Sequence, residues 1–229
     1  MTETFTIRQM QESEVEETYL LIDKEGWNLT LDKFTHLFRS RPEAFTVAVT
    51  PSGEVVGTVS FFPTFPNEYV LGNIVIKGPY RHKGMGYKLV EAMMAQRPNC
   101  VVSCTAVPGA DQFYLNVGFK FTEPQQGHDI FHILLDTHDI NQRCQQQDTT
   151  TTVQDFDPAS FHDLVTYDRE VKGYESREYV SMMVDCFKTW VARDGRGSLV
   201  GFAAAFIKRD EIVLDSLCAD SPEVACLFI

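Results

Sequence analysis

The chain has 229 residues, 44% of them hydrophobic, and a formal net charge of −12. This length suits one large domain or two small ones, with enough apolar side chains for a packed core. The acidic balance argues against nucleic acid as a partner, because phosphate contacts need a basic face, and it favours cationic ligands.

No uncharged apolar run is long enough to cross a bilayer, and the N-terminal stretch MTETFTIRQM lacks the basic and then apolar pattern of a signal peptide. We therefore expect a cytoplasmic protein without a membrane partner. The six cysteines are scattered, without Cys-x-x-Cys spacing, so reduced thiols are expected rather than disulfides. We expect no metal either, because His128 and His132 share a strand face but have no third ligand.

Hydrophobic periodicity predicts helices and strands in the order β-α-α-β-β-β-α-β-α-β over the first half of the chain. Thr30 is expected to cap a helix that Pro42 ends. The predicted strands are 5–8, 45–49, 55–62, 69–76, 100–105 and 128–135, and the predicted helices are 12–24, 31–39, 87–97 and 111–117.

Beyond the last of these strands the sequence becomes polar and repetitive, which is typical of a linker. The following segment is an imperfect repeat of the first, in which Val56-Gly57 recurs as Val200-Gly201 at nearly the same offset as other matched pairs. We therefore place a first domain at residues 1–138, a polar linker at 139–151 and a second domain at 152–229.

The stretch RHKGMG at 81–86 lies between an apolar strand and a helix. A strand that leads through a glycine turn into a helix leaves backbone N–H groups unpaired at the positive end of the helix dipole. Such a turn binds anions, and pyrophosphate suits it. Gly84 and Gly86 let the main chain approach the phosphates without a Cβ in the way. Positive charge comes from the three basic residues of the stretch, Arg81, His82 and Lys83.

This R-x-x-G-x-G spacing resembles the acetyl-CoA loop of the GNAT superfamily of N-acetyltransferases, and FYLNVGF at 113–119 resembles that family's F-Y-x-x-x-G-F signature. Both signatures occur in the family's order, and the predicted elements also follow the GNAT order. The resemblance implies an α/β (α+β) fold in which helices flank a central, mixed and mostly antiparallel sheet. It also implies that acetyl-CoA is the cosubstrate.

The resemblance extends to individual cofactor contacts. The backbone of Ile74, Val75 and Ile76 would pair with the pantetheine arm like an added strand, and the same N–H groups would serve the oxyanion. Val107 stands where many family members have an asparagine, so one cofactor contact differs here. The expected cofactor-binding residues are Ile74, Val75, Ile76, Arg81, His82, Lys83, Gly84, Met85, Gly86 and Tyr87.

Two residues are assigned catalytic roles by the same resemblance. Tyr114 matches the tyrosine that protonates the CoA thiolate in many family members, and the alternative is that it only packs against the cofactor arm. Glu68, acting through a water molecule, is our choice for the base that deprotonates the amine. Val70 occupies the position where some members have a glutamate, and Glu68 is otherwise a solvated acid at a strand end.

The second half resembles a partial GNAT-like unit, as in a subgroup of the family that has a second such domain. In place of the glycine loop it has ADSPE at 219–223, with no glycine and two acids, so we expect it to bind no cofactor. A small sheet with an open edge needs a cover, which the first domain or a second copy in a homodimer would supply.

The features together predict an acetyl-CoA-dependent N-acetyltransferase, which transfers the acetyl group directly to a primary amine of a small molecule or to an amine-bearing side chain. The alternative is a non-catalytic acetyl-CoA-binding sensor or scaffold, and a third interpretation is a protein-interaction domain. Membership of the family does not specify the acceptor amine, because this fold hosts many acceptors.

Overall fold

The computed structural model describes residues 5–65, 68–96, 99–120, 150–174, 176–209 and 211–229. The chain divides into two compact units, residues 1–128 and 129–229, and each is described by itself. The predicted strand at 128–135 and nearly all of the predicted linker at 139–151 lie outside the described residues.

The first unit is built on a five-stranded sheet in the order β1-β2-β3-β4-β5. Its first four strands are antiparallel neighbours, and β5 joins β4 in parallel. The predicted mixed, mostly antiparallel sheet is therefore confirmed. In chain order the elements are β1 (Thr6–Gln9), α1 (Val15–Asp23), α2 (Leu31–Ser40), β2 (Phe45–Val49), β3 (Val55–Phe65), β4 (Glu68–Ile76), α3 (Met85–Ala95), β5 (Val101–Ser103) and α4 (Asp111–Asn116).

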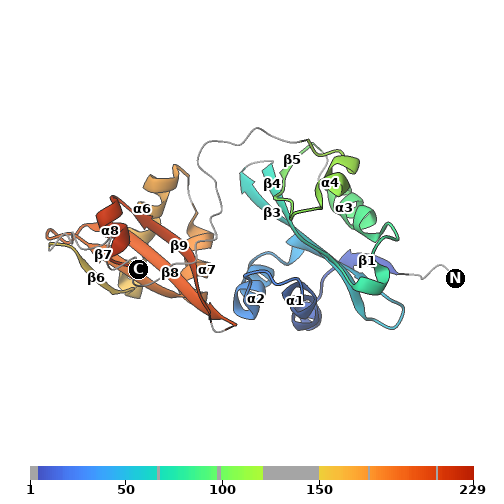
Figure 1. The fold of residues 1–229 in the computed structure, drawn as a ribbon, viewed down its shortest axis with the longest axis horizontal. Helices are drawn as coiled ribbons and strands as arrows, with labels where there is room; N and C mark the ends of the chain where they lie inside the picture. Colours follow the sequence, from blue (N-terminus) through green and yellow to red (C-terminus); the bar gives the residue numbers. More distant parts are fainter. Residues whose placement is uncertain (1–4, 66–67, 97–98, 121–149, 175, 210) are drawn as a thin grey trace. The chain divides into compact units, whose positions relative to one another are not determined.

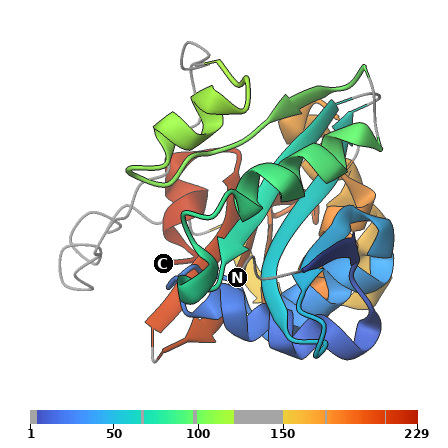
Figure 2. The same cartoon turned by 90° about the vertical axis from the view of Figure 1, so that its right-hand side faces the viewer.

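Helices cover both faces of this sheet, with α1 and α2 on one face and α3 on the other (Figures 1 and 2). All five residues of β2 are buried, as expected for a strand that is covered on both sides. Phe45 and Val47 belong to the hydrophobic cluster under α1 and α2, whereas Ala48 belongs to the cluster under α3. Alternate side chains along the strand therefore contribute to two separate cores.

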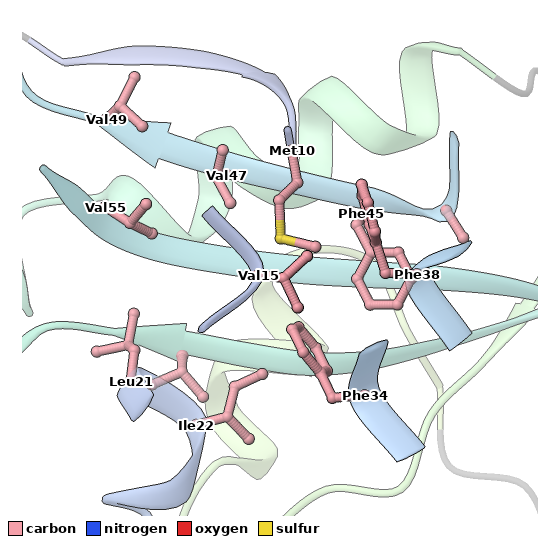
Figure 3. Close-up of a cluster of buried hydrophobic side chains, with 12 residues drawn as sticks. Met10, Val15, Leu21, Ile22, Phe34, Phe38, Phe45, Val47, Val49 and Val55 are labelled. Atoms are coloured by element: carbon pink, nitrogen blue, oxygen red, sulfur yellow. The ribbon is translucent and has the colours of Figure 1, made fainter. Parts of the chain in front are cut away.

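Aromatic rings pack with aliphatic side chains in the core under α1 and α2 (Figure 3). The Phe45 ring contacts several other rings, with ring-centroid distances of 5.3 Å to Phe34 and 5.8 Å to Phe38, both in edge-to-face geometry. Such pairs add to the free energy gained by burying the rings. The α2 helix that supplies both partners begins where the sequence predicts, because the Thr30 hydroxyl accepts a hydrogen bond from the Lys33 N–H at 3.2 Å.

A glycine lets α3 approach the sheet closely. A Cβ on Gly57 of β3 would lie 2.9 Å from Ile76 Cδ1 and 3.1 Å from both Leu89 and Met85 of α3. The sequence predicts the helix at 87–97, whereas it begins at Met85 and ends at Ala95. The start differs because Met85 is already a core residue, 2% exposed, that packs toward Gly57.

The second unit has a four-stranded antiparallel sheet in the order β6-β7-β8-β9. Two helices precede the last three strands, as the sequence predicts, and a short helix that it does not predict follows them. The elements are β6 (Thr152–Asp155), α6 (Phe161–Lys172), α7 (Arg177–Cys186), β7 (Lys188–Arg193), β8 (Leu199–Lys208), β9 (Glu211–Ala219) and α8 (Pro222–Cys226).

The central hairpins of the two units have the same register. Ala48 pairs with Gly57 in the first unit, and Ala192 pairs with Gly201 in the second. The register then shifts directly after Ala48 and directly after Ala192. Gly201 also resembles Gly57 in its surroundings, because a Cβ there would lie 3.1 Å from Val224 of α8.

Phe45→Ala should destabilise the first unit by about 3–5 kcal/mol, because it removes a fully buried ring that contacts several other rings. Unfolding in urea can be followed by the fluorescence of Trp27, which packs against this core, in a Trp190→Phe background. Leu20→Ala is the matched control, since Leu20 is 51% exposed. A midpoint shift no larger than that of the control would contradict the central role of Phe45.

Candidate active site

The first unit contains a cavity of about 670 Å³. Its walls come from the second half of β4, the loop that leads into α3, the first turn of α3, α4 and the chain just after α1. These segments lie far apart in the sequence and meet only in the folded unit. A cavity of this size is within the range of small-molecule sites.

The cavity opens where two parallel strands part. β4 pairs with β5 at Glu68, Tyr69 and Val70, and the pairing ends there. From Leu71 to Ile76 one edge of β4 has no strand partner among the described residues, and all six of these residues line the cavity. Backbone N–H and C=O groups on such an edge can pair with an extended ligand as they would with a strand.

A bulge in β4 alters the direction of its backbone groups at this edge. Ser60 pairs with Gly72 and Thr58 pairs with Val75, so that Asn73 and Ile74 together oppose one residue of β3. Asn73 has a φ of 51°, in the left-handed region that asparagine tolerates better than most residues. Its side-chain amide donates a hydrogen bond to the Ser60 hydroxyl at 3.0 Å, which holds the bulge in place.

The glycine loop opens directly into α3. Gly84 is the N-cap residue with a φ of 78°, and it provides no side-chain cap for the helix. The N–H groups of the first helical turn therefore have no intrahelical partner and point out of the positive end of the helix. Because Gly84, Met85, Gly86 and Tyr87 all line the cavity, this helix end forms one of its walls.

The three basic residues of the loop have different surroundings. The Arg81 Nε–H donates to the Ile76 carbonyl at 2.7 Å, and its guanidinium also forms an ion pair with Glu25. His82 has a φ of 60° and lines the cavity. The Lys83 ammonium lies 5.7 Å from the centroid of the Tyr80 ring, and Lys83 is not part of the cavity wall.

Gly86 links the two signature motifs by a close contact. A Cβ on Gly86 would lie 3.1 Å from Cε2 of Phe113, the first residue of the F-Y-x-x-x-G-F signature. The sequence analysis assigns Gly86 to the approach of phosphates, and the structure adds that a side chain here would displace Phe113. Because Phe113 precedes Tyr114 in α4, the contact also sets the position of α4 beside α3.

The rest of the second signature is a helix C-cap. Gly118 has a φ of 97°, the Phe119 N–H donates to the Tyr114 carbonyl at 3.0 Å, and the Gly118 N–H donates to the Leu115 carbonyl at 3.1 Å. This is the Schellman pattern, in which glycine takes the left-handed position. The Tyr114 and Phe119 rings complete it with a centroid distance of 5.6 Å, so the spacing of the signature follows from helix termination.

Tyr114 itself lines the cavity. Burial, and after it the nearby Cys104 thiol, raises the pKa of the Tyr114 phenol above its ordinary value. The phenol therefore stays protonated throughout the neutral range and can serve as a proton donor. Burial also raises the pKa of the Cys104 thiol, which keeps it in the less nucleophilic thiol form.

Ten of the twelve residues predicted for the site line this cavity, and Glu68 and Lys83 do not. Glu68 is exposed at the opposite end of β4, where the strand still pairs with β5. The ten that line the cavity are Ile74, Val75, Ile76, Arg81, His82, Gly84, Met85, Gly86, Tyr87 and Tyr114.

Seven further polar or aromatic residues line the cavity and are not among the twelve predicted site residues: Glu25, Trp27, Asn73, Tyr80, Thr105, Phe113 and Asn116. The dipeptide Gly72-Asn73 inside an apolar strand is a bulge signal that could have identified Asn73. No comparable local signal marks Glu25, which precedes the left-handed Gly26 in the turn after α1.

The loop before α8 in the second unit corresponds to the glycine loop before α3, but it has a different helix start. The Ser221 hydroxyl caps α8 by accepting from the Val224 N–H at 3.3 Å, and Pro222 at the first helical position has no N–H to offer. Asp220 accepts a hydrogen bond from the Tyr167 hydroxyl at 2.7 Å, and Glu223 adds a negative charge to the first turn. This helix start is satisfied by its own residues and repels anions.

Within the described ranges, no group of three or more His, Cys, Asp or Glu side chains is arranged to hold a metal ion, and His128 and His132 lie outside those ranges. The helices in the same ranges are all too short or too polar to span a membrane.

Comparison with known proteins gives matches over both parts of the chain. A Caenorhabditis elegans protein described as the uncharacterized protein F36G3.2 is 26% identical over 221 residues, which cover 90% of this chain and 68% of that protein. A solved structure from Pyrococcus horikoshii, provisionally described as an acetyltransferase, covers 98% of this chain and 74% of its own, with 15% identity and a TM-score of 0.62.

A GCN5-related N-acetyltransferase from Kribbella flavida also matches 98% of this chain and 61% of its own, with 14% identity and a TM-score of 0.55. At these identities the two solved structures establish the fold. The model of the acetyltransferase (GNAT) domain family matches residues 8–134, which is more than half of the chain and includes both signature motifs. The chain therefore belongs to the GNAT acetyltransferase family.

Proposed function

We propose that the protein transfers the acetyl group of acetyl-CoA directly to a primary amine of a small molecule or to an amine-bearing side chain. The observation that carries this proposal is a cavity in which three features meet: the edge of β4 that has no strand partner among the described residues, the start of α3 without a side-chain cap, and the Tyr114 phenol. They supply, in order, strand-like hydrogen bonds, an anion site and a proton donor.

The residues present suit acetyl-CoA. The N–H groups at the start of α3 would hold the pyrophosphate, because the helix dipole and the left-handed Gly84 leave them directed at an anion. The backbone of Ile74, Val75 and Ile76 would pair with the amide groups of the pantetheine arm. Met85 would contribute through its backbone alone, since its side chain is buried in the core.

Acetyl transfer needs an amine held against the thioester, stabilisation of the oxyanion that forms, and protonation of the thiolate that leaves. Backbone N–H groups beside the bulge at Asn73 can donate to the oxyanion without contributing side chains. Tyr114, which lines the cavity and whose raised pKa keeps the phenol protonated, would donate its phenolic proton to the CoA thiolate.

The base that deprotonates the amine has less support. Glu68 is exposed and outside the cavity, so its role would need water molecules to carry the proton from the amine. That assignment stays a prediction. Exchange of the amine proton with solvent water would serve the same purpose for an acceptor that reaches the cavity from its open side.

The test is release of free thiol from acetyl-CoA in the presence of a panel of primary amines, with acetylated amine identified by mass spectrometry. Amine-dependent release by the wild-type protein supports the proposal. Binding of acetyl-CoA without release by any amine would instead favour the non-catalytic sensor or scaffold.

Gly84→Asp should weaken CoA binding at least about tenfold more than Gly84→Asn, because only the aspartate places a negative charge beside the phosphates. The two variants are matched, since Asn and Asp both tolerate a left-handed φ and nothing lies within 4 Å of a Cβ at this position. Isothermal titration calorimetry measures the affinity. Equal affinities of the two variants would remove the start of α3 from the anion site.

The same titration tests the second unit, which we propose binds no cofactor because Ser221 and Glu223 close its helix start. We expect one CoA per wild-type chain and no residual site of wild-type affinity in Gly84→Asp. Two sites in the wild-type protein, of which one survives in Gly84→Asp, would contradict this proposal.

Tyr114→Phe should lower the turnover number roughly 10²- to 10⁴-fold, the usual range for loss of a general acid, and should leave the affinity for CoA nearly unchanged. Steady-state rates with a fixed amine and calorimetric titration with CoA measure the two effects. Tyr174→Phe in the second unit, where Tyr174 is 42% exposed, is the control for loss of a hydroxyl. Near-normal turnover would reduce Tyr114 to a packing role.

A further inference from the structure

Among the described residues that line the cavity, Glu25 is the single carboxylate. It lies in the turn between α1 and α2, two residues before Trp27, which also lines the cavity. A carboxylate in a cavity that would hold a pyrophosphate opposes the binding of the anion. The same negative charge attracts a cationic ligand.

Arg81 determines where this carboxylate lies. The Arg81 guanidinium contacts the Ile76 carbonyl through Nε and the Glu25 carboxylate through a terminal nitrogen. One planar group thus joins the end of β4, the glycine loop and the turn after α1, across 56 residues of sequence. A lysine could not make both contacts in a fixed geometry, because its ammonium is a single point of charge.

The pair is only partly shielded from solvent. The Arg81 side chain is 43% exposed and the Glu25 side chain is 30% exposed. Both residues line the cavity, so a ligand can reach either partner without unfolding the turn. A pyrophosphate at the start of α3 competes with Glu25 for Arg81, and a cation competes with Arg81 for Glu25. A pyrophosphate that binds Arg81 therefore leaves Glu25 available to the cation, and a cation that binds Glu25 neutralises the charge that opposes the pyrophosphate.

We propose that Glu25 recognises the positive charge of the acceptor, and that Arg81 positions the Glu25 carboxylate at the cavity wall. The acceptor class is then a cationic amine, and Trp27, which lines the same cavity, offers an aromatic ring of the kind that attracts cations. This inference rests on the proposed acetyl transfer and narrows its substrate. Glu25 acts here in recognition and takes no part in bond making.

The test compares two primary amines of similar size, benzylamine, which is cationic at neutral pH, and aniline, which is uncharged. Glu25→Gln should raise the KM for benzylamine about 5- to 20-fold, the effect of losing a partly exposed charged partner, and should leave the KM for aniline within about twofold of wild type. A purely structural role for Glu25 would change both values together.

The same variant should have the opposite effect on the affinity for CoA. Glu25→Gln removes a negative charge from beside the pyrophosphate site and frees Arg81, so the affinity for CoA should rise about two- to fivefold at low salt. Glu25→Asp retains the charge and should recover most of the discrimination between the two amines. This variant keeps the test valid if Glu25→Gln proves unstable.

Glu54→Gln is the matched control. Glu54 forms an ion pair with Lys77 just beyond the end of the same β4 strand, is similarly exposed at 38%, and is not part of the cavity wall. It removes the same charge from the first unit and should leave both KM values and the CoA affinity unchanged.

The outcomes separate this inference from the proposed function. A wild-type protein that acetylates both amines, with equal KM changes for both in Glu25→Gln, overturns the role of Glu25 alone. A wild-type protein that binds acetyl-CoA but releases no thiol with any amine overturns the acetyl transfer itself, and the acceptor role of Glu25 with it.

Discussion

The parting of β4 from β5 after Val70 is the constraint on which the site depends. Backbone N–H and C=O groups at a strand edge are strong hydrogen-bonding groups, so an edge without a strand partner can pair with an extended ligand. The packing of the helices keeps this edge open. α3 lies close against β3 at Gly57, and α4 lies against α3 through Phe113, so the chain after β5 is led away from β4.

Two glycines of the first unit are needed because neighbouring side chains pack where a Cβ would lie, whereas Gly84 is needed for its left-handed backbone conformation. Gly57 and Gly86 each leave room for large neighbouring side chains, and Gly201 does the same under α8 in the second unit. In both units, a glycine in a central strand thus lets a helix pack closely against the sheet, α3 in the first unit and α8 in the second. The units differ at the helix start, which has no side-chain cap at Gly84 and is capped by Ser221 in the second unit.

Local chemistry made much of the fold predictable from the sequence. β2 has the bounds that the sequence predicts, and α2 begins after its Thr30 cap. Both signature motifs could be recognised because each is a short-range backbone device, namely a glycine turn into a helix and a C-cap at Gly118. Element boundaries were less predictable. α3 begins earlier than periodicity indicates, because Met85 gains its burial from a distant strand.

By itself, the sequence determined the order of the described elements, the glycine turn before α3 and the position of Tyr114 in a helix that Gly118 terminates. Each of these depends on residues within one or two turns of each other. Only the tertiary structure decided which side chains share the cavity. It brings Glu25 to Arg81, places Phe113 against Gly86 and leaves Glu68 outside. These outcomes depend on how helices pack on the sheet, and contacts between residues far apart in the chain leave no periodic or spacing signal in a single sequence.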